Sequence, residues 1–230
     1  MGSHPPSSIS VYQLSISLRH ISPLIWRRLL VRSDTTIAKL HNIVQCAMSW
    51  EDLHLHRFCI HGKDYGVYQP GGLLFDDDPT RVFLADFRLR PGERFVYQYD
   101  FGDFWQHDIR LERVLALTAG ERYPRAIAGT GDCPPEDCGG PMGYHALITE
   151  QYSWLAGLNL QDDVLLVAER LLAFYDRGPR PTQDDTEFVQ ALERLQQREE
   201  NIPARFDRRA VNAALSPLGK EILSNSRFKS

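Results

Sequence analysis

Residues 95–112, FVYQYDFGDFWQHDIRLE, decide the fold of this chain. Aromatic residues occupy every second position from Phe95 to Phe101, and the same period of two returns from His107 to Leu111. Successive side chains of a β-strand point to opposite faces, so each half is typical of a strand with one buried face. The Gly-Asp pair between the halves is typical of a tight turn. The stretch therefore predicts an antiparallel hairpin.

The chain before this hairpin shows the same alternation. It predicts strands over residues 12–18, 25–31 and 54–61, and the first two are expected to pair as a second antiparallel hairpin. Between them and the third strand, apolar residues recur at helical spacing from Ile37 to Met48. This spacing predicts a helix whose apolar side lies on the sheet.

The chain after the hairpin changes character. Residues 119–143 hold many glycines and prolines around two cysteines, which predicts an ordered excursion rather than regular structure. Apolar residues at helical spacing follow, and they predict helices over residues 144–155, 164–175 and 188–195.

Strands first and helices last are the order of an α+β protein. We predict an antiparallel sheet built from hairpins and packed by helices, with a C-terminal helical extension. The expected organisation is a disordered N-terminus or vector remnant at residues 1–9, an α+β core domain at 10–158, a helical extension at 159–215 and a frayed tail at 216–230.

Composition excludes several classes of protein. The 230 residues are 43% hydrophobic and 24% charged, which is typical of a soluble globular protein. The net charge of -4 argues against attraction to nucleic acid through overall charge. No apolar run is long enough to span a bilayer, and the first ten residues lack a secretion signal. We therefore expect a cytoplasmic protein with reduced cysteines and no membrane partner.

Three stretches together resemble a known bacterial family. They are VYQLSISLRHISPLIWRRLLV with the later WEDLHLHRF, then YQYDFGDFWQHDIRLE, then RYPRAIAGTGDCPPEDCGGPMGY. Over residues 10–150 the chain resembles the plasmid pRiA ORF-three-like family, named after the third open reading frame of a root-inducing plasmid. The resemblance implies a cytoplasmic protein associated with plasmids or insertion elements, and it carries no mechanism over.

A metal site is one interpretation of the cysteines and histidines. Cys133 and Cys138 lie five positions apart in a turn and can hold one Zn²⁺ if the fold brings two further ligands. The candidates are His107, His54, His56 and His145, of which His54 and His56 lie on one face of a predicted strand. The alternative is a rigid turn with two reduced, half-buried thiols and ordinary hydrogen-bonded histidines.

The hairpin turn gathers a second set of chemical groups. Asp100, Asp103 and His107 surround a glycine and are candidates for cation binding or for acid and base catalysis. The alternative is structural, because aspartates form turns readily and His107 shares a face with apolar residues.

Arginines provide the candidate contacts to a partner. Arg27 and Arg28 follow Trp26, and guanidinium groups beside an aromatic ring suit phosphates and stacked bases. On a strand the two arginines point to opposite faces, so they do not form one patch unaided. A solvated edge with ion pairs to acidic residues is the alternative.

Two hypotheses about function follow. The favoured one is a non-enzymatic cytoplasmic binding or accessory module of a plasmid or mobile element, with a protein or a nucleic acid as partner. The alternative is a metal-dependent hydrolase or nuclease-type enzyme, with zinc as the cofactor, that uses Asp100, Asp103, His107, Cys133 and Cys138. Nucleotide-binding and hydrolase signatures are absent from the sequence.

Overall fold

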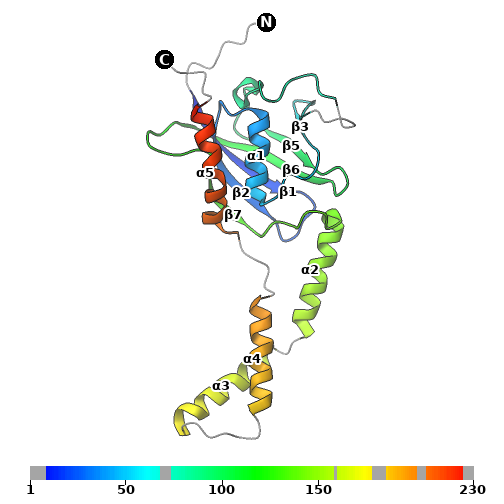
Figure 1. Cartoon of the computed structure of the whole chain (residues 1–230), viewed down its shortest axis with the longest axis vertical. Helices are drawn as coiled ribbons and strands as arrows, with labels where there is room; N and C mark the ends of the chain where they lie inside the picture. The colour runs from blue at the N-terminus through cyan, green and yellow to red at the C-terminus, as the bar shows by residue number, and fades with distance from the viewer. Residues whose placement is uncertain (1–8, 68–73, 158–159, 178–184, 201–205, 225–230) are drawn as a thin grey trace. The chain divides into compact units, whose positions relative to one another are not determined.

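The computed structural model describes residues 9–67, 74–157, 160–177, 185–200 and 206–224 (Figure 1). The chain divides into two compact units, each described by itself. The first unit is Met1–Tyr144 with Arg205–Ser230, and the second is His145–Ala204. The predicted disordered stretch at 1–9 lies, except for its last residue, outside the described residues.

The first unit is built on one antiparallel sheet, and this confirms the predicted α+β class. Within the described ranges the sheet has seven strands in the order β4-β3-β5-β6-β1-β2-β7. They are β1 (Ser10–Leu18), β2 (Trp26–Arg32), β3 (His56–Ile60), β4 (Lys63–Tyr65), β5 (Arg94–Tyr99), β6 (Trp105–Ala116) and β7 (Arg125–Thr130).

Alternation along the strands sets the two faces of the sheet. In β1, Leu14 and Ile16 are fully buried, while Ser15 between them is half-buried. β5 and β6 form the expected hairpin, with Phe95 opposite Ile109 in the buried row. One face therefore forms the core, and the other carries polar side chains.

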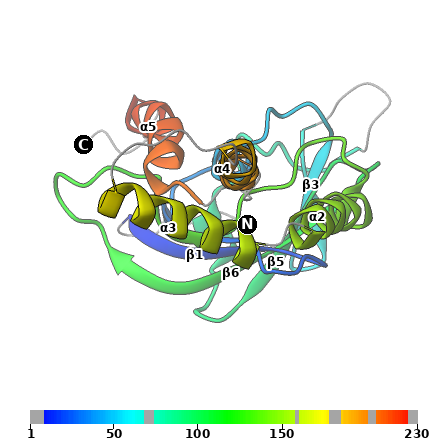
Figure 2. The same cartoon turned by 90° about the horizontal axis from the view of Figure 1, so that it is seen from below.

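Two helices cover the core face. α1 (Ile37–Met48) begins at Thr36, whose hydroxyl accepts a hydrogen bond from the backbone N–H of Lys39 at 3.2 Å. α5 (Arg208–Ser224) contributes Val211 and Leu215 to the same apolar core as α1. Figure 1 shows both helices lying over the sheet, and Figure 2 shows α5 on one side of it.

β7 and α5 differ from the predicted organisation. β7 lies inside the Gly- and Pro-rich residues 119–143, and its place is set by pairing with β2. α5 runs through residues where the sequence predicts the end of a helical extension and a frayed tail. Its Pro217 lies inside the helix, although such a residue usually marks a helix end. Tertiary contacts, rather than local signals, place both elements.

Helices make up the rest of the described chain. α2 (Gly140–Gly157) begins in the first unit and continues into the second, and η1 (Leu84–Phe87) is a single turn before β5. In the second unit, α3 (Leu160–Arg177) and α4 (Asp185–Glu200) are joined by an ion pair of Asp163 and Arg194 at 2.5 Å. Among the described helices, none combines the length and apolar composition that a membrane crossing requires.

Asn212 joins α5 to the edge strand β7. Its side-chain oxygen accepts from the backbone N–H of Ala126 at 2.7 Å, and its amide donates to the Ala126 carbonyl at 3.0 Å. Because Ala126 is 3% exposed, Asn212→Ala leaves two buried backbone groups unpaired. We expect the free energy of unfolding to fall by about 1–3 kcal/mol in urea titrations. Arg209→Ala, an exposed change in the same helix, is the control, and an equal loss there would contradict this role.

Candidate functional site

Three segments that are distant in sequence meet in the first unit. They are residues 50–54 after α1, residues 99–105 around the β5–β6 turn, and residues 133–140 after β7; we call them the motif junction. The indole N–H of Trp50 donates to the carbonyl of Pro134 at 2.9 Å, which ties the first segment to the third. These segments are the ones that carry the three motifs, so the fold brings the motifs together.

Further hydrogen bonds hold the motif junction. The backbone N–H of Glu51 donates to the Glu136 carboxylate at 2.8 Å, and the Tyr99 hydroxyl donates to the same carboxylate. Burial raises the pKa of Tyr99, and the bond to Glu136 raises it further, so the phenol stays protonated as a donor. The N–H of Gly139 donates to the Asp103 carboxylate at 3.0 Å. Each segment is thus fastened to another by a charged acceptor.

One histidine and two carboxylates converge at the motif junction. Nε2 of His54 lies 2.8 Å from Oδ1 of Asp137 and 3.7 Å from Oδ2 of Asp100. All three ligand atoms lie within 4.8 Å of one another. The side chain of Asp100 is 9% exposed, and that of Asp137 is 64% exposed. The group is therefore anchored at one end and open to solvent at the other; we call it the His54 cluster.

Backbone strain gathers around the same place. Of the eight non-glycine residues with positive φ in the described part of the chain, five lie in or beside the motif junction: Ser49, Asp52, Asp100, Phe104 and Asp137. Their φ values run from 53° to 60°, in the left-handed region that non-glycine residues seldom adopt. Such residues persist where surrounding contacts fix them, and they concentrate at functional sites. The strain is a second, independent mark of this site.

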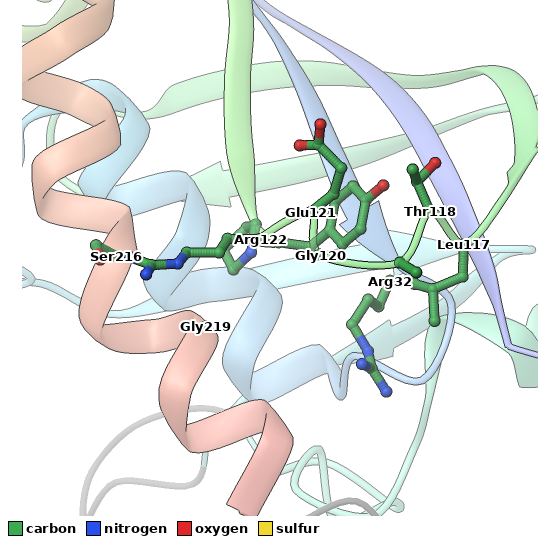
Figure 3. A pocket seen from close by; sticks show the side chains of 11 residues that line it. Arg32, Leu117, Thr118, Gly120, Glu121, Arg122, Ser216 and Gly219 are labelled. Carbon is green, nitrogen blue, oxygen red and sulfur yellow. The ribbon is translucent and has the colours of Figure 1, made fainter.

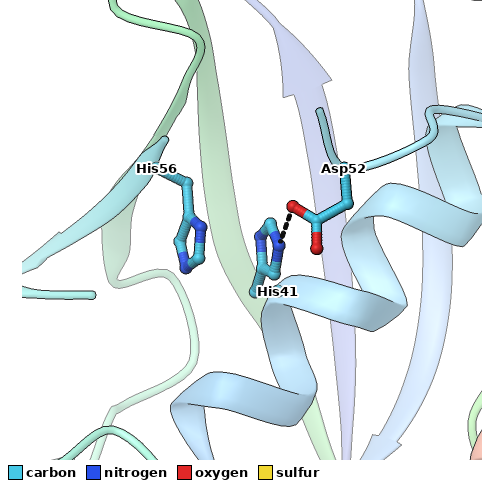
Figure 4. Close-up of side chains that lie close together, drawn as sticks. All are labelled: His41, Asp52 and His56. Atoms are coloured by element: carbon cyan, nitrogen blue, oxygen red, sulfur yellow. Dashed lines mark hydrogen bonds and ion pairs between the residues drawn. The ribbon is translucent and has the colours of Figure 1, made fainter. Parts of the chain in front are cut away.

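A second group of possible ligands lies nearby, at His41, Asp52 and His56 (Figure 4). His41 uses both ring nitrogens, Nδ1 toward the Tyr97 hydroxyl at 2.8 Å and Nε2 toward Asp52 at 2.7 Å. Since Gln45 donates to the Tyr97 oxygen, the Tyr97 hydroxyl is free to donate to His41. This is a satisfied hydrogen-bond network.

The stacking of His41 on His56 argues against a shared metal ion there. Their ring centroids are 3.4 Å apart and the planes differ by 5°. Nitrogen lone pairs lie in the ring planes, so two parallel rings cannot aim them at one ion. Burial lowers the pKa of His56 to about 3, so its imidazole is neutral. His54 and His56, predicted as joint ligands, thus belong to different groups.

His107 lies in the core below the motif junction. It is fully buried, its ring meets Trp50 edge-on at 5.3 Å, and backbone carbonyls of Tyr97 and Trp105 lie beside its ring nitrogens. Burial lowers its pKa to about 3, so the imidazole is neutral. Asp100 and Asp103 lie at the motif junction, but His107 is not in the ligand group that Asp100 joins.

The two cysteines take different environments. The Cys133 thiol accepts a hydrogen bond from Nη2 of Arg27 at 2.9 Å and donates to the Met48 sulfur at 3.3 Å. Burial raises the pKa of Cys133 to about 12, so the group is a thiol at neutral pH. Cys138 is half-buried, and burial raises its pKa too. Within the described residues, neither cysteine joins a group of three ligand atoms.

Asp137 is the residue that sequence reasoning missed. It lies between the two cysteines that the sequence predicts as metal ligands. Its left-handed backbone conformation directs the carboxylate toward His54. An acidic residue inside a Cys-to-Cys turn was the available signal.

The arginines separate as predicted, with one on each face of β2. Arg27 is 2% exposed and donates to the carbonyls of Ala47, Trp26 and Thr130, each at 2.9 Å. Its guanidinium also lies 4.5 Å from the ring centroid of Phe206. These contacts account for Arg27 within the protein core.

Arg28 and Trp26 lie on the polar face of the sheet. Arg28 binds the Glu112 carboxylate through two nitrogens at 2.6 and 2.8 Å. The same guanidinium lies 5.1 Å from the centroid of the Trp26 ring.

The groove in Figure 3 lies away from the motif junction, between the segment 117–124 and α5. Its volume is about 480 Å³. Arg32 on its wall pairs with Asp34 at 2.6 Å, and Glu121 pairs with Arg125 at 2.7 Å. Two of its three charged side chains are thus paired with residues that do not line the groove.

The sheet, its two covering helices and the motif junction define an α+β protein with one helix-covered face. The chain belongs to the plasmid pRiA4b ORF-3-like protein family, whose model matches residues 10–152. This confirms the resemblance carried by the three motifs.

Two relatives agree with this assignment. The chain is 37% identical over 136 residues to the uncharacterized protein y4hQ of Sinorhizobium fredii (strain NBRC 101917 / NGR234), covering 59% of this chain and 70% of that protein. It is also similar to the crystal structure of MM3350 of Methanosarcina mazei Go1, a protein of unknown function. The TM-score is 0.57 at 35% identity, over 70% of this chain and 89% of that one.

We expect the loss of Arg27 to lower the stability of the protein much more than the loss of Arg28. Arg27→Met removes the buried guanidinium and its hydrogen bonds to three carbonyls, so we expect the free energy of unfolding to fall by about 3 kcal/mol or more. Arg28→Met removes a partly exposed ion pair, with an expected loss below about 1 kcal/mol. Chemical denaturation of both variants checks the contrast, and equal losses would contradict it.

His107 makes stability depend on pH. The folded protein keeps the ring neutral, with a pKa near 3, while the unfolded chain takes up a proton below its ordinary value of 6.5. The unfolded state then binds more protons, so stability falls as the pH drops below 6.5. The His107 contribution at about pH 5 is a loss of roughly 2 kcal/mol.

His107→Phe removes this contribution and fills the same space, so its stability is expected to fall less between about pH 7 and about pH 5. Denaturant titrations at the two pH values measure the difference. His61→Asn, at an exposed left-handed position that Asn tolerates, is the control and keeps the wild-type dependence. An unchanged slope in His107→Phe would refute the neutral buried ring.

Proposed function

We propose that this chain is a cytoplasmic binding or accessory module, and that the His54 cluster binds a divalent cation that fastens the motif junction. The observation that carries the proposal is the convergence of His54, Asp100 and Asp137 within 4.8 Å, from three separate segments. The family, with its plasmid association, is compatible with an accessory role.

The distances suit a cation. Ligand atoms that share a transition-metal ion at ordinary bond lengths are about 3.0–3.4 Å apart when adjacent. The two measured separations from His54 Nε2, 2.8 and 3.7 Å, bracket this range. One imidazole with two carboxylates favours Zn²⁺ or Mn²⁺ over Ca²⁺, which prefers oxygen alone.

A backbone hydrogen bond orients Asp100 within the His54 cluster. Oδ1 of Asp100 accepts from the N–H of Gly102 at 2.8 Å, which leaves Oδ2 to face His54. A ligand held by a backbone donor is oriented before the ion arrives. Because Asp137 is exposed, an ion drawing it in would order the residues 133–140 against the rest of the junction.

The hydrolase or nuclease alternative uses the same ion differently. Three protein ligands leave positions for water or a phosphate oxygen, as metal-dependent hydrolysis requires. The sequence suggests five residues for such an enzyme. Of these, Asp100 lies in the His54 cluster, whereas Asp103, His107, Cys133 and Cys138 do not. An enzyme in this chain would therefore depend on His54 and Asp137 instead.

Equilibrium dialysis against Zn²⁺ and Mn²⁺, with metal counted by elemental mass spectrometry, tests the proposal. We expect one ion per chain, with affinity lowered about tenfold or more in Asp100→Asn and in Asp137→Asn. Asparagine keeps the size, the left-handed φ and the Gly102 hydrogen bond, so these variants should fold.

Asp52→Asn, in the His41 group, is the matched control and should bind as the wild type does. Loss of binding in Asp52→Asn but not in Asp137→Asn would move the site to the His41 group. Metal-dependent cleavage of bis(p-nitrophenyl) phosphate that disappears in Asp100→Asn would favour the hydrolase alternative.

A further inference from the structure

A row of arginines crosses the polar face of the sheet. Arg94 of β5 is directly opposite Arg110 of β6. On its other side Arg110 neighbours Ser15 of β1, and Ser15 neighbours Arg28 of β2. Within the first unit, α1 and α5 pack on the other face through the core. Three guanidinium groups and a hydroxyl thus share one line across four strands.

Two of these arginines make no direct ion pair, although the charge of Arg110 helps to lower the pKa of the nearby Glu112 carboxyl. Arg28 is paired with Glu112, but Arg94 and Arg110 make no ion pair with any residue that the structure describes. Both are exposed, and like charges directly opposite each other on neighbouring strands destabilise a sheet. A bound anion between them would offset that repulsion.

The same face holds an aromatic ring beside the arginines. Trp26 is opposite Ser17, and the two line a shallow hollow of about 230 Å³ together with Arg28, Arg94 and Arg110. Asp108 and Glu112 also line it, but each carboxylate is already paired with an arginine, Asp108 with Arg19 and Glu112 with Arg28. The Arg28 guanidinium already lies over the Trp26 ring at 5.1 Å. Bases stack on such aromatic and guanidinium surfaces, and the gain is independent of base identity.

We propose that this arginine face binds single-stranded nucleic acid. Arg94 and Arg110 contact successive backbone phosphates, the hydroxyls of Ser15 and Ser17 donate to phosphate oxygens, and Trp26 receives a base. A duplex keeps its bases stacked inside, so it cannot use Trp26. The inference goes beyond the proposed function, since the face shares no residue with the His54 cluster and needs no cation.

Fluorescence anisotropy with labelled oligo-dT and oligo-rU of about 12 nucleotides, in chelator, tests the proposal. For Arg94→Gln/Arg110→Gln we expect affinity to fall about tenfold or more, and the slope of log K against log salt to shrink by about 1.4, the value for two phosphate contacts. Quenching of Trp fluorescence on binding should disappear in Trp26→Phe. The arginines are exposed, so both variants should fold, as circular dichroism would verify.

Arg122→Gln removes one arginine charge at an exposed position beside the groove of Figure 3, and it should bind as the wild type does. Equal weakening in Arg122→Gln, or no binding by the wild-type protein at low salt, would overturn the proposal. So would equally tight binding of polyglutamate or of duplex DNA, which would show attraction to polyanions without base stacking. Asp137→Asn should bind the oligonucleotides as the wild type does. Weaker binding by this variant would show that the arginine face and the His54 cluster are not independent.

Discussion

The buried guanidinium of Arg27 is the constraint on which the first unit depends. Its donors reach the end of α1, the edge strand β7 and the thiol of Cys133, and its flat face lies against Phe206 at the approach to α5. A charge taken out of water is tolerated only when its donors are satisfied. Four parts of the chain must therefore be in place together, and Cys133, at the head of the third junction segment, is among them. The contact between Arg27 and Cys133 therefore helps to fix the position of the motif junction.

The motif junction shows how such anchoring is used. Asp100 and Asp137 sit at left-handed φ, a conformation that costs energy but turns a short acidic side chain sharply out of its strand or loop. The cost is offset by hydrogen bonds that end on Glu136, on Asp103 and on the Pro134 carbonyl. Most of these bonds join different segments rather than neighbours in sequence. Bonds between segments thus position most of the cluster before any ligand binds, and selective cation binding depends on such positioning.

Most strands of the sheet could be predicted from the sequence, because the signals for strands are local. Alternation placed β1, β2, β5 and β6, and helical spacing placed α1, since burial there repeats along the chain itself. β7 and α5 have no such signal: β7 is made of small residues among glycines, and Pro217 resembles a helix end. For the site, the sequence named Asp100 and His54, which follow or precede strands, but it could not show that His107 faces the core or that a left-handed turn presents Asp137. Those facts depend on contacts between segments far apart.

The core of the first unit includes a helix that lies beyond the part of the chain matched by the family. The family model matches residues 10–152, yet Val211 and Leu215 of α5 lie in the core beside α1, and Asn212 satisfies the edge strand β7. Gly219 matters as well, because a Cβ there would lie 2.6 Å from the Tyr123 carbonyl oxygen. The second unit is therefore an insertion within the first, placed between α2 and α5. A sheet with one face closed by both helices and the other left polar can carry two separate sites, one in loops and one on strands, because neither uses the residues that build the core.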